Sequence, residues 1–520
     1  MTTSKSDDDH HQPFVNHEKN NNPDYNDSNP NSNNKHKFKL KMNSNLNEQH
    51  LQSSTPTHTS ANNHTSQSIR RNFLLFSTLF SLNHGTVVSC LSLATARLGN
   101  DLGAYQSSAL YGSYTLSALL GATYVVKRLG GSGKGAVVLG MWIYCAYVAC
   151  FAWAAFLRKE NETVSLLMEI IILLGGILGG IGGGFLWMAQ GTYFARVSSE
   201  YATSLSIPVS DAGNELAGSF AAIYLGGELC LRLFSTVAIG TFGGSWSDVF
   251  LMYTAIAIGS TVWMGRRVTW YEQTEEEARE DLHSSVWTKA TRTVRVLRDD
   301  WRMKYMIPLC VVFGFAAAFV TSFVNGEVLR VALDDVHSLY VGLLGSVTAA
   351  VAAVCSIVFG WMAKRTGNGW VLVLGCVAFS VPSGLFWLWP GLEEWGFWSL
   401  LGIYGLQGVG RATFEGNLRA EFAVLFGDEK EGAFGNIIFW NGLATAIGFL
   451  LTAKVRCAEV GTYCIQYKDG SLHDVLLYEV LVLASAALTL CSFWRLSCVR
   501  KQEERRVIME SQLSIDQHLL

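Results

Sequence analysis

The sequence predicts an all-α membrane protein in which twelve transmembrane helices form two pseudo-symmetric six-helix bundles. Of its 520 residues, 49% are hydrophobic, only 16% are charged and 50 are glycine. A soluble protein of this length needs more charge to cover its surface, whereas glycine is common where helices pack together inside membranes. Apolar segments of about 20 residues, the length that crosses a bilayer, recur along the chain. A basic motif also repeats between two of them.

The predicted spans fall into two groups of six. Residues 1–69 are rich in Asn, Ser, His and Asp and bury too little apolar surface to offset their ordering entropy, so we expect a disordered tail. Residues 70–268 and 305–495 form the two bundles, and a charged connector, 269–304, joins them. Residues 496–520 form a C-terminal tail. The spans lie near 72–94, 105–126, 136–157, 165–189, 214–238, 248–268, 305–326, 338–363, 370–390, 396–418, 431–453 and 475–495.

Lysine and arginine are concentrated in one set of predicted loops. Basic residues mark cytosolic loops, so we expect both termini and the connector in the cytosol. The set comprises Arg70, Arg71, Lys127, Arg128, Lys134, Arg266, Arg267, Lys364, Arg365, Arg495 and Arg500. The sequon at Asn161 then lies on the outer or lumenal side and is a candidate for glycosylation, whereas the sequon at Asn63 lies in the cytosolic tail and stays unmodified.

The sequence predicts neither an enzyme nor a cofactor or metal site. It has no nucleophile motif, no CxxC pair and no predicted domain outside the membrane large enough for an active site. The formal charge of −3 argues against nucleic-acid binding. Several of the 11 cysteines lie in apolar runs and act as small apolar residues. Cys457 and Cys464 share the last outer loop, and the sequence leaves open whether they form a disulfide or stay reduced.

A glycine-rich stretch, "GGILGGIGGG" at residues 175–184, occurs within the fourth span. No Lys-Ser/Thr pair follows it and its surroundings are apolar, so it does not match a phosphate-binding loop. Gly175, Gly179 and Gly183 are spaced four residues apart and therefore share one face of a helix. The pattern predicts a surface for close helix packing.

The basic motif follows the second span of each half, as "KRLG" at residues 127–130 and "KRTG" at residues 364–367. Matching positions in both halves indicate two bundles related by a pseudo-twofold axis along the membrane normal. These hairpins resemble the cytosolic gate loop of the major facilitator superfamily, which contains Asp-Arg/Lys-x-Gly and locks neighbouring helices in one access state. Lys127 and Lys364 occupy its acidic position, before Arg128 and Arg365, and so depart from the superfamily's charge relay.

Two further stretches resemble the Unc-ninety-three-like family, a branch of the same superfamily. They are "LWMAQGTYFARVS" at residues 186–198 and the polar block from "GVGRATFEGN" to "FWNGLATAIGF" at residues 408–449. The resemblance implies a twelve-span facilitator fold across residues 70–495. It leaves the function open, because the family is associated with channel regulation and receptor trafficking as well as with transport.

Polar residues within the spans are costly to place in lipid, so they are candidates for a solute or ion pathway. His84, beside Asn83, lies near the midplane of the first span. It either binds a solute or proton or is a neutral histidine bonded between helices. Gln190 in the fourth span either lines an inner vestibule or bonds between helices. Asn325 and Glu327, near the outer end of the seventh span, form part of an outer gate unless Glu327 simply faces water.

Two charged pairs complete the candidate pathway. Glu228 and Arg232 lie four residues apart on the fifth span, and Arg411 and Glu415 repeat this spacing in reverse order on the tenth. Each pair shares one helical face and can neutralise itself. Each pair is therefore either a static ion pair or part of a polar cavity between the bundles.

Two functions are consistent with these features. The first is a secondary transporter that moves a small solute or ion across the lipid bilayer by alternating access. The alternative is a non-transporting regulatory subunit or trafficking partner of an ion channel or receptor. The C-terminal "SIDQHLL" resembles an acidic dileucine sorting signal, so the expected location is the plasma membrane or an endosomal or vacuolar membrane.

Overall fold

The computed structural model describes residues 65–121, 134–157, 165–271, 286–335, 337–426, 430–454 and 472–519. All its regular elements within these ranges are helices, as the sequence predicted. Several predicted features lie outside the described residues, namely most of the N-terminal tail with Asn63, the loop residues Lys127, Arg128 and Asn161, and the cysteines Cys457 and Cys464.

A helical segment is present at each of the twelve predicted spans. The first six are α1 (Ser66–Leu98), α2 (Asn100–Leu116) with the π-helical η1 (Ser117–Gly121), α4 (Lys134–Leu157), α5 (Leu166–Leu205), α6 (Val209–Gly240) and α7 (Trp246–Arg267). The connector contains α9 (Val286–Asp299). The last six are α10 (Trp301–Phe319) with η2 (Val320–Val328) and α11 (Leu329–Ala332), α12 (Leu339–Thr366), α13 (Asn368–Leu388), α14 (Phe397–Ala412) with η4 (Thr413–Leu418) and α15 (Arg419–Leu425), α16 (Lys430–Lys454) and α17 (Leu472–Leu519).

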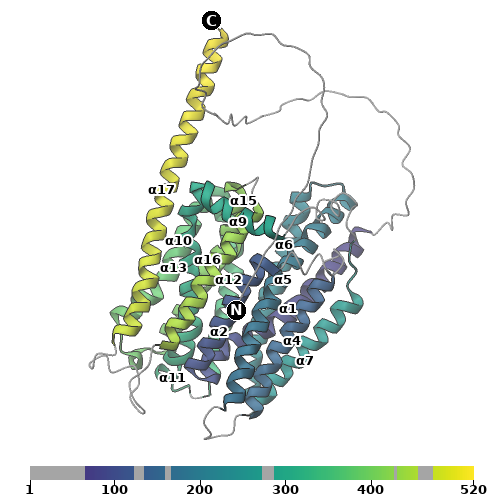
Figure 1. Ribbon diagram of the computed structural model, residues 1–520, viewed down its shortest axis with the longest axis vertical. Helices are drawn as coiled ribbons and strands as arrows, with labels where there is room; N and C mark the ends of the chain where they lie inside the picture. Colours follow the sequence, from purple (N-terminus) through teal and green to yellow (C-terminus); the bar gives the residue numbers. More distant parts are fainter. Residues whose placement is uncertain are drawn as a thin grey trace, which may run out of the picture. The chain divides into compact units, whose positions relative to one another are not determined.

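Ten helices in the described part of the chain are long and apolar enough to cross a membrane. The two other predicted spans correspond to α2 and α14, whose regular α-helices have 17 and 16 residues before they pass into π-helical turns. Two helices extend past their predicted ends: α5 continues to Leu205 and α17 to Leu519. Both extensions are more polar than the spans they follow, so hydropathy does not register them. The α17 extension is rich in residues that favour helices, whereas the α5 extension is not. Figure 1 shows α17 projecting beyond the bundle.

The glycine of the second basic motif has a defined structural role. Gly367 has φ +84°, a conformation that side chains with a Cβ rarely adopt, and it both ends α12 and begins α13. The chain therefore reverses direction over one residue, immediately after Lys364 and Arg365. This geometry explains why a glycine follows the basic pair.

The helices of the two halves pack in the same pattern. The first helix of each half packs on the fifth, as α1 on α6 and α10 on α16. The second packs on the fourth, as α2 on α5 and α12 on α14, and the third on the sixth, as α4 on α7 and α13 on α17. The predicted pseudo-symmetry is therefore present in the helix neighbours.

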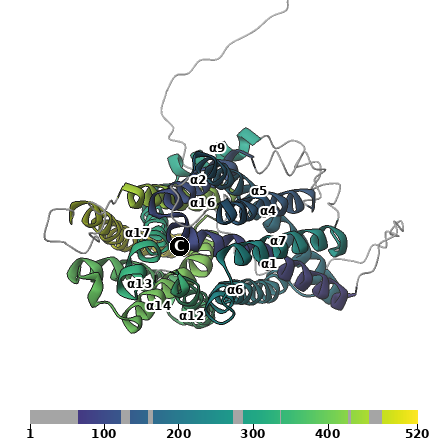
Figure 2. The same ribbon diagram turned by 90° about the horizontal axis from the view of Figure 1, so that it is seen from below.

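The interface between the halves follows the same symmetry. The second helix of each half packs on the fifth helix of the other, so that α2 contacts α16 and α6 contacts α12. Figure 2 shows these two pairs on opposite sides of the bundle, with α1 between them. Glu228 thus lies on α6, a helix of this interface, and His84 on α1 between the two pairs, whereas Arg411 lies on α14, which packs on α12.

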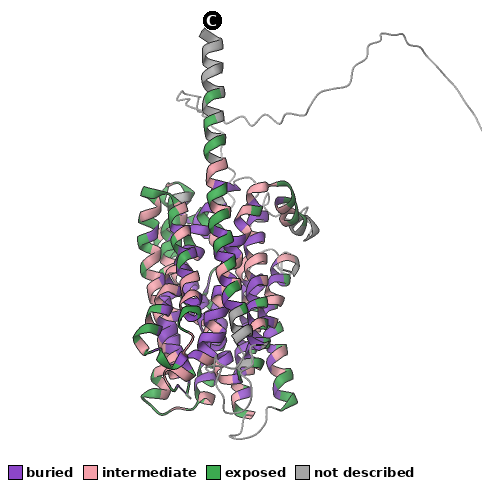
Figure 3. Ribbon diagram, turned by 90° about the vertical axis from the view of Figure 1, so that its left-hand side faces the viewer, coloured by how far each residue is buried: buried purple, intermediate pink, exposed green. Residues whose placement is uncertain are grey.

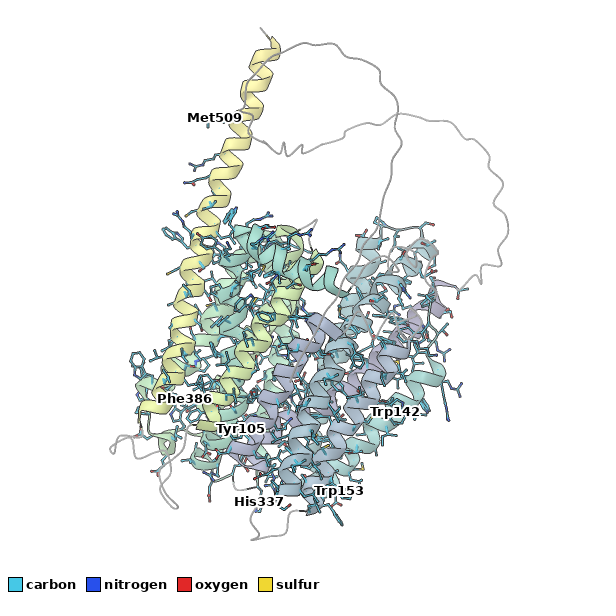
Figure 4. The ribbon with its side chains drawn as sticks, viewed as in Figure 1. Tyr105, Trp142, Trp153, His337, Phe386 and Met509 are labelled. Carbon is cyan, nitrogen blue, oxygen red and sulfur yellow. The ribbon has the colours of Figure 1, made fainter. Side chains whose placement is uncertain are left out.

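The surface of the bundle is apolar where it would meet lipid. Large side chains such as Phe156, Ile357 and Trp398 are more than three-quarters exposed. Figure 3 shows that buried residues lie on the inner sides of the helices and exposed residues on the outside. Trp142 and Trp153 point outward from α4 (Figure 4). An exposed apolar surface of this extent is expected for helices in a bilayer.

The predicted glycine packing face is confirmed, and a second face lies beside it. Gly175, Gly179 and Gly183 lie against α4, where a Cβ atom would come within 2.7–2.9 Å of side-chain atoms of Cys150, Tyr147 and Tyr144. The neighbouring glycines Gly176, Gly180 and Gly184 lie in the same way against α2 and η1. The stretch therefore lets α5 approach two helices at once.

We expect Gly176→Ala to destabilise the protein by roughly 1–3 kcal/mol, because the added methyl group would lie 2.6 Å from the Gln106 carbonyl oxygen. The matched control is Gly191→Ala in the same helix, where no atom lies within 4 Å of the new Cβ. The thermal unfolding midpoint of purified protein measures the difference. Equal midpoints for the two variants would contradict the close packing.

Candidate functional site

An ion pair joins the two halves at mid-depth of the bundle. Glu228 on α6 accepts two hydrogen bonds from Arg411 on α14, from Nη1 to Oε1 and from Nη2 to Oε2, both at 2.7 Å. Both residues lie near the middle of their continuous helical segments. Because this bidentate pairing fixes both distance and orientation, it sets how the two halves meet at this level.

Both predicted pairs are also present, so that four residues form one network. Arg232 Nη2 lies 2.9 Å from Glu228 Oε1, and Arg411 Nε donates to Glu415 Oε1 at 2.8 Å. We call Arg232, Glu228, Arg411 and Glu415 the charge network. It has no net charge, and its central bond crosses between halves. Sequence spacing revealed the two pairs within helices but carried no signal for the bond between them.

Glycines on neighbouring helices make room for the network. A Cβ at Gly345 of α12 would clash with Arg232 Nη1, and Gly342 lies against the backbone of the same arginine. On the other side of α6, a Cβ at Gly85 of α1 would meet Leu231 at 2.6 Å and the Glu228 backbone at 3.7 Å. Close packing on both sides of α6 therefore excludes water from Glu228, whose side chain is 1% exposed.

Exposure within the network increases from Glu228 towards Glu415. The side chain of Glu228 is 1% exposed, that of Arg411 is 13% exposed and that of Glu415 is 33% exposed, whereas that of Arg232 is 10% exposed. Glu415 lies one turn from Arg411 towards the end of the bundle that bears Arg70, Lys134, Arg266, Lys364 and Arg365, which we call the basic face. The network is therefore more exposed at its end near the basic face than at Arg232, its other end.

His84 lies in an aromatic cluster beside the network. Its ring centroid is 5.1 Å from that of Trp187, 5.5 Å from Tyr224 and 5.7 Å from Tyr144. The side chain is almost fully buried, and Nδ1 has no hydrogen-bond partner. Because its helix neighbour Gly85 contacts Glu228, His84 lies at the depth of the network.

The signature segment on α5 contributes to this region. Trp187 packs edge-on against His84, and Gln190 lies half-buried one turn closer to the basic face. Tyr193 stabilises the basic face instead: it accepts a hydrogen bond from Asn72 Nδ2 at 3.0 Å and packs against Phe76. The signature therefore combines one residue beside the site with one that holds helix ends together.

Asn83 lies apart from the charge network. Its amide nitrogen donates to the Ala257 carbonyl at 3.2 Å and to Thr261 Oγ1 at 3.1 Å, both on α7. It also lies 3.4 Å from the Met141 carbonyl of α4. These bonds hold three helices of the first half together, which is a structural role, and the place of Asn83 in the solute pathway stays a prediction.

The halves are also bonded at the opposite face. Asn325 Nδ2 donates to the Ser92 carbonyl of α1 at 2.9 Å, and its Oδ1 accepts from the Tyr404 hydroxyl. Thr95 donates to the Ser322 carbonyl at 3.2 Å. Glu327 is half-buried and pairs with Arg330 at 2.8 Å. Asn325, a predicted gate residue, thus joins both halves, whereas Glu327 pairs within its own half.

Further bonds extend this closure to the helix ends. Thr236 donates to the Leu339 carbonyl at 2.9 Å, and Trp246 Nε1 donates to the His337 carbonyl at 3.1 Å. Asp335 caps α12 by accepting from the Leu339 and Tyr340 amides. Burial raises the pKa of the Asp335 carboxyl despite these bonds. The halves are therefore held together near the opposite face.

The remaining predicted residues lie at the surface. Lys364 and Arg365 are exposed at the end of α12, where the Arg365 guanidinium lies 3.8 Å from the centre of the Trp361 ring. No group of three or more His, Cys, Asp or Glu side chains that could hold a metal ion occurs among the described residues.

We expect Arg411→Ala to destabilise the protein by roughly 3–5 kcal/mol, because it leaves the buried Glu228 with one cationic partner instead of two. Glu415→Ala, which removes a carboxylate that is one-third exposed, should cost about 1 kcal/mol or less. Free energies of unfolding in nanodiscs measure both effects. Because Glu228→Gln also removes the carboxylate that pairs with Arg232, the coupling is measured with a double-mutant cycle. The losses for Glu228→Gln and Arg411→Gln should not add in the double variant, and additive losses would argue against direct coupling.

Comparison with known proteins supports the motif-based resemblance. No protein-family model matches the chain. Human protein unc-93 homolog A is 26% identical over 432 residues, which cover 76% of this chain and 90% of the human protein. UNC93-like protein 3 of Arabidopsis thaliana is 24% identical over 393 residues, covering 72% of this chain and 79% of that protein.

Solved structures share the fold at much lower identity. The nucleoside transporter NupG superposes with a TM-score of 0.59 at 13% identity, over 83% of this chain and 99% of that one. A D-xylose-proton symporter superposes with a TM-score of 0.56 at 13% identity, over 82% and 96%. Taken together with the two motifs and the helix packing, these matches show that the chain is a homologue of the unc-93 proteins and has the fold of the major facilitator transporters.

Proposed function

We propose that this protein is a secondary transporter that moves a small polar or ionic solute by alternating access. The observation that carries the proposal is the charge network, whose central bond joins the two halves at mid-depth. Two halves that bind a solute between them and rock about it need an interaction at that depth which both can make and break. Glu228 and Arg411 are placed to provide it.

The direction of access follows from the contacts between the halves. Asn325, Thr95, Thr236 and Trp246 close the opposite face, whereas the network becomes more exposed towards the basic face. We assign the basic face to the cytosol, because lysine and arginine mark cytosolic loops. In this conformation the solute would enter or leave on the cytosolic side.

A solute would bind by competing for groups that now pair with one another. An anionic group would compete with Glu228 for Arg411, and a cationic group would compete with Arg411 for Glu228 or Glu415. The unpartnered His84 Nδ1, Trp187 and Gln190 lie beside these residues and would contact the uncharged part of the solute. Loss of the Glu228–Arg411 bond would then free the halves to move.

One observation favours the alternative, a regulatory or trafficking partner of a channel or receptor. All four charges of the network are paired, so it can also act as a permanent brace. Lys364 replaces the acidic residue of the superfamily's gate loop, as Lys127 does in the first half. A protein of this kind would keep the helix arrangement but would not need the central bond to break.

A ligand screen followed by flux measurements tests the transport proposal. Purified protein is screened against amino acids, sugars, nucleosides, organic ions and alkali cations for thermal stabilisation, and each hit is tested for uptake into proteoliposomes. We expect Glu228→Gln and Arg411→Lys to reduce uptake at least tenfold. The exposed Arg298→Gln on α9 serves as the matched control and should transport normally.

Two results would contradict transport. One is a solute that stabilises the protein but shows no flux in either direction under an imposed gradient. The other is unchanged flux in folded Glu228→Gln and Arg411→Lys variants. Co-purification of a stoichiometric membrane protein in the first case would favour the regulatory alternative.

Glycosylation tests the assigned orientation. Expressed in eukaryotic cells, the protein should carry a glycan at Asn161 but not at Asn63, because only the outer or lumenal side meets the glycosylation machinery. Asn161→Gln should therefore remove the glycosidase-sensitive shift on a gel, and Asn63→Gln should leave it unchanged. The reverse pattern would place the basic face outside.

A further inference from the structure

Helices α13 and α17 of the second half pack antiparallel in a register that two contacts define. A Cβ at Gly369 would meet the Phe493 ring at 3.0 Å, and the Cys376 thiol donates to the Ala486 carbonyl at 3.6 Å. Ser383 follows Cys376 by seven residues on α13, and Glu479 precedes Ala486 by seven residues on α17. The same register therefore places Ser383 level with Glu479.

Both residues at this level have unsatisfied polar atoms. Glu479 is 3% exposed and Ser383 is fully buried. Neither Glu479 Oε1 nor Ser383 Oγ has a hydrogen-bond partner. A buried polar atom without a partner is rare and costly, so two in register indicate that something absent from the protein chain alone connects them.

Among the residues that the structure describes, none supplies a positive charge to Glu479. It lies on α17, which packs on α10, α13 and α16, and no Lys, Arg or His of the described residues forms an ion pair with it. The titratable groups on these faces are the Tyr478 hydroxyl, which donates to the Phe315 carbonyl, and the thiols of Cys376 and Cys310. None of these groups is cationic.

Aromatic rings enclose the same region. Phe386, one turn from Ser383, lies 4.4 Å from Trp395 and 6.0 Å from Phe319, which in turn lies 5.2 Å from Tyr478. Figure 4 shows Phe386 beside the lower end of α17. An ionised carboxylate within a membrane span and among such rings costs several kcal/mol unless a cation neutralises it.

We propose that Glu479 and Ser383 form a proton-binding site in the second half, separate from the charge network. A single proton neutralises the carboxylate, and protonated Glu479 can then donate to Ser383 Oγ, whose own O–H stays available as a donor. The two side chains are not hydrogen-bonded to each other in this structure, so the bond requires a side-chain rotation. The proton binds reversibly to a carboxylate oxygen, and no other bond forms or breaks. Two oxygens match a proton better than an alkali cation, which needs a larger set of oxygen ligands. The inference does not depend on transport.

The site is tested by the pH dependence of stability. The folded chain holds a proton that the unfolded chain releases, so wild-type stability should fall as pH rises from about 5 to about 8. Glu479→Gln keeps the shape without the titrating group, and its stability should change less over this range. An unchanged slope in folded Glu479→Gln would overturn the proposal. Replacing sodium with potassium or a large organic cation at constant pH should leave the stability difference between wild type and Glu479→Gln unchanged. A difference that depends on the cation would overturn the proton site in favour of a metal-ion site.

Infrared spectroscopy tests the partner independently of stability. The difference between wild-type and Glu479→Gln spectra should contain the carbonyl band of a protonated carboxyl group at neutral pH. Ser383→Ala should shift this band to higher frequency, because it removes the hydrogen bond. Ser380→Ala, at a half-buried position of α13 whose hydroxyl donates to the Val377 carbonyl, is the matched control and should leave the band unchanged. Absence of the band, or the same band in Ser383→Ala, would contradict the assigned pair.

Discussion

The Glu228 carboxylate of α6 and the Arg411 guanidinium, at the end of α14, neutralise each other across the boundary between the two halves. Each charge alone would be costly at this depth, and each has a partner in the other half. Arg232 pairs with Glu228 at one end of the network and Glu415 pairs with Arg411 at the other, so the four charges sum to zero. The helices around this network are therefore constrained: α1 and α12 carry glycines where they pass it, and α6 is held between them.

Two of the three π-helical segments among the described residues occur where the spans are polar. The segment η4 contains Glu415, and η2 contains Asn325 and Glu327, whereas η1 is mostly apolar. A π-helical turn shifts the direction of the side chains that follow it and is often retained at functional positions. These two segments thus hold one residue of the network and two near the closed opposite face, whereas helices such as α4 and α7 are regular.

The same features bear on both candidate functions. A balanced network that spans two halves can hold them in one arrangement, and it becomes a switch only if a ligand offers its members a better partner. The closed opposite face and the partial exposure of Glu415 describe one conformation, and a transporter would need a second. A second conformation is reached only if a bound solute stabilises it more than the paired network stabilises the present one.

The sequence by itself determined the helical class, the positions of the spans, the matching halves, the glycine face at Gly175 and the two charged pairs, because each of these depends on local composition or on spacing along one helix. Only the tertiary structure decided that Arg411 pairs with Glu228 and that Asn83 donates hydrogen bonds to other helices of the first half. It also placed Ser383 level with Glu479. These contacts join helices far apart in the chain, and the register between packed helices is set by side-chain fit that no local pattern records.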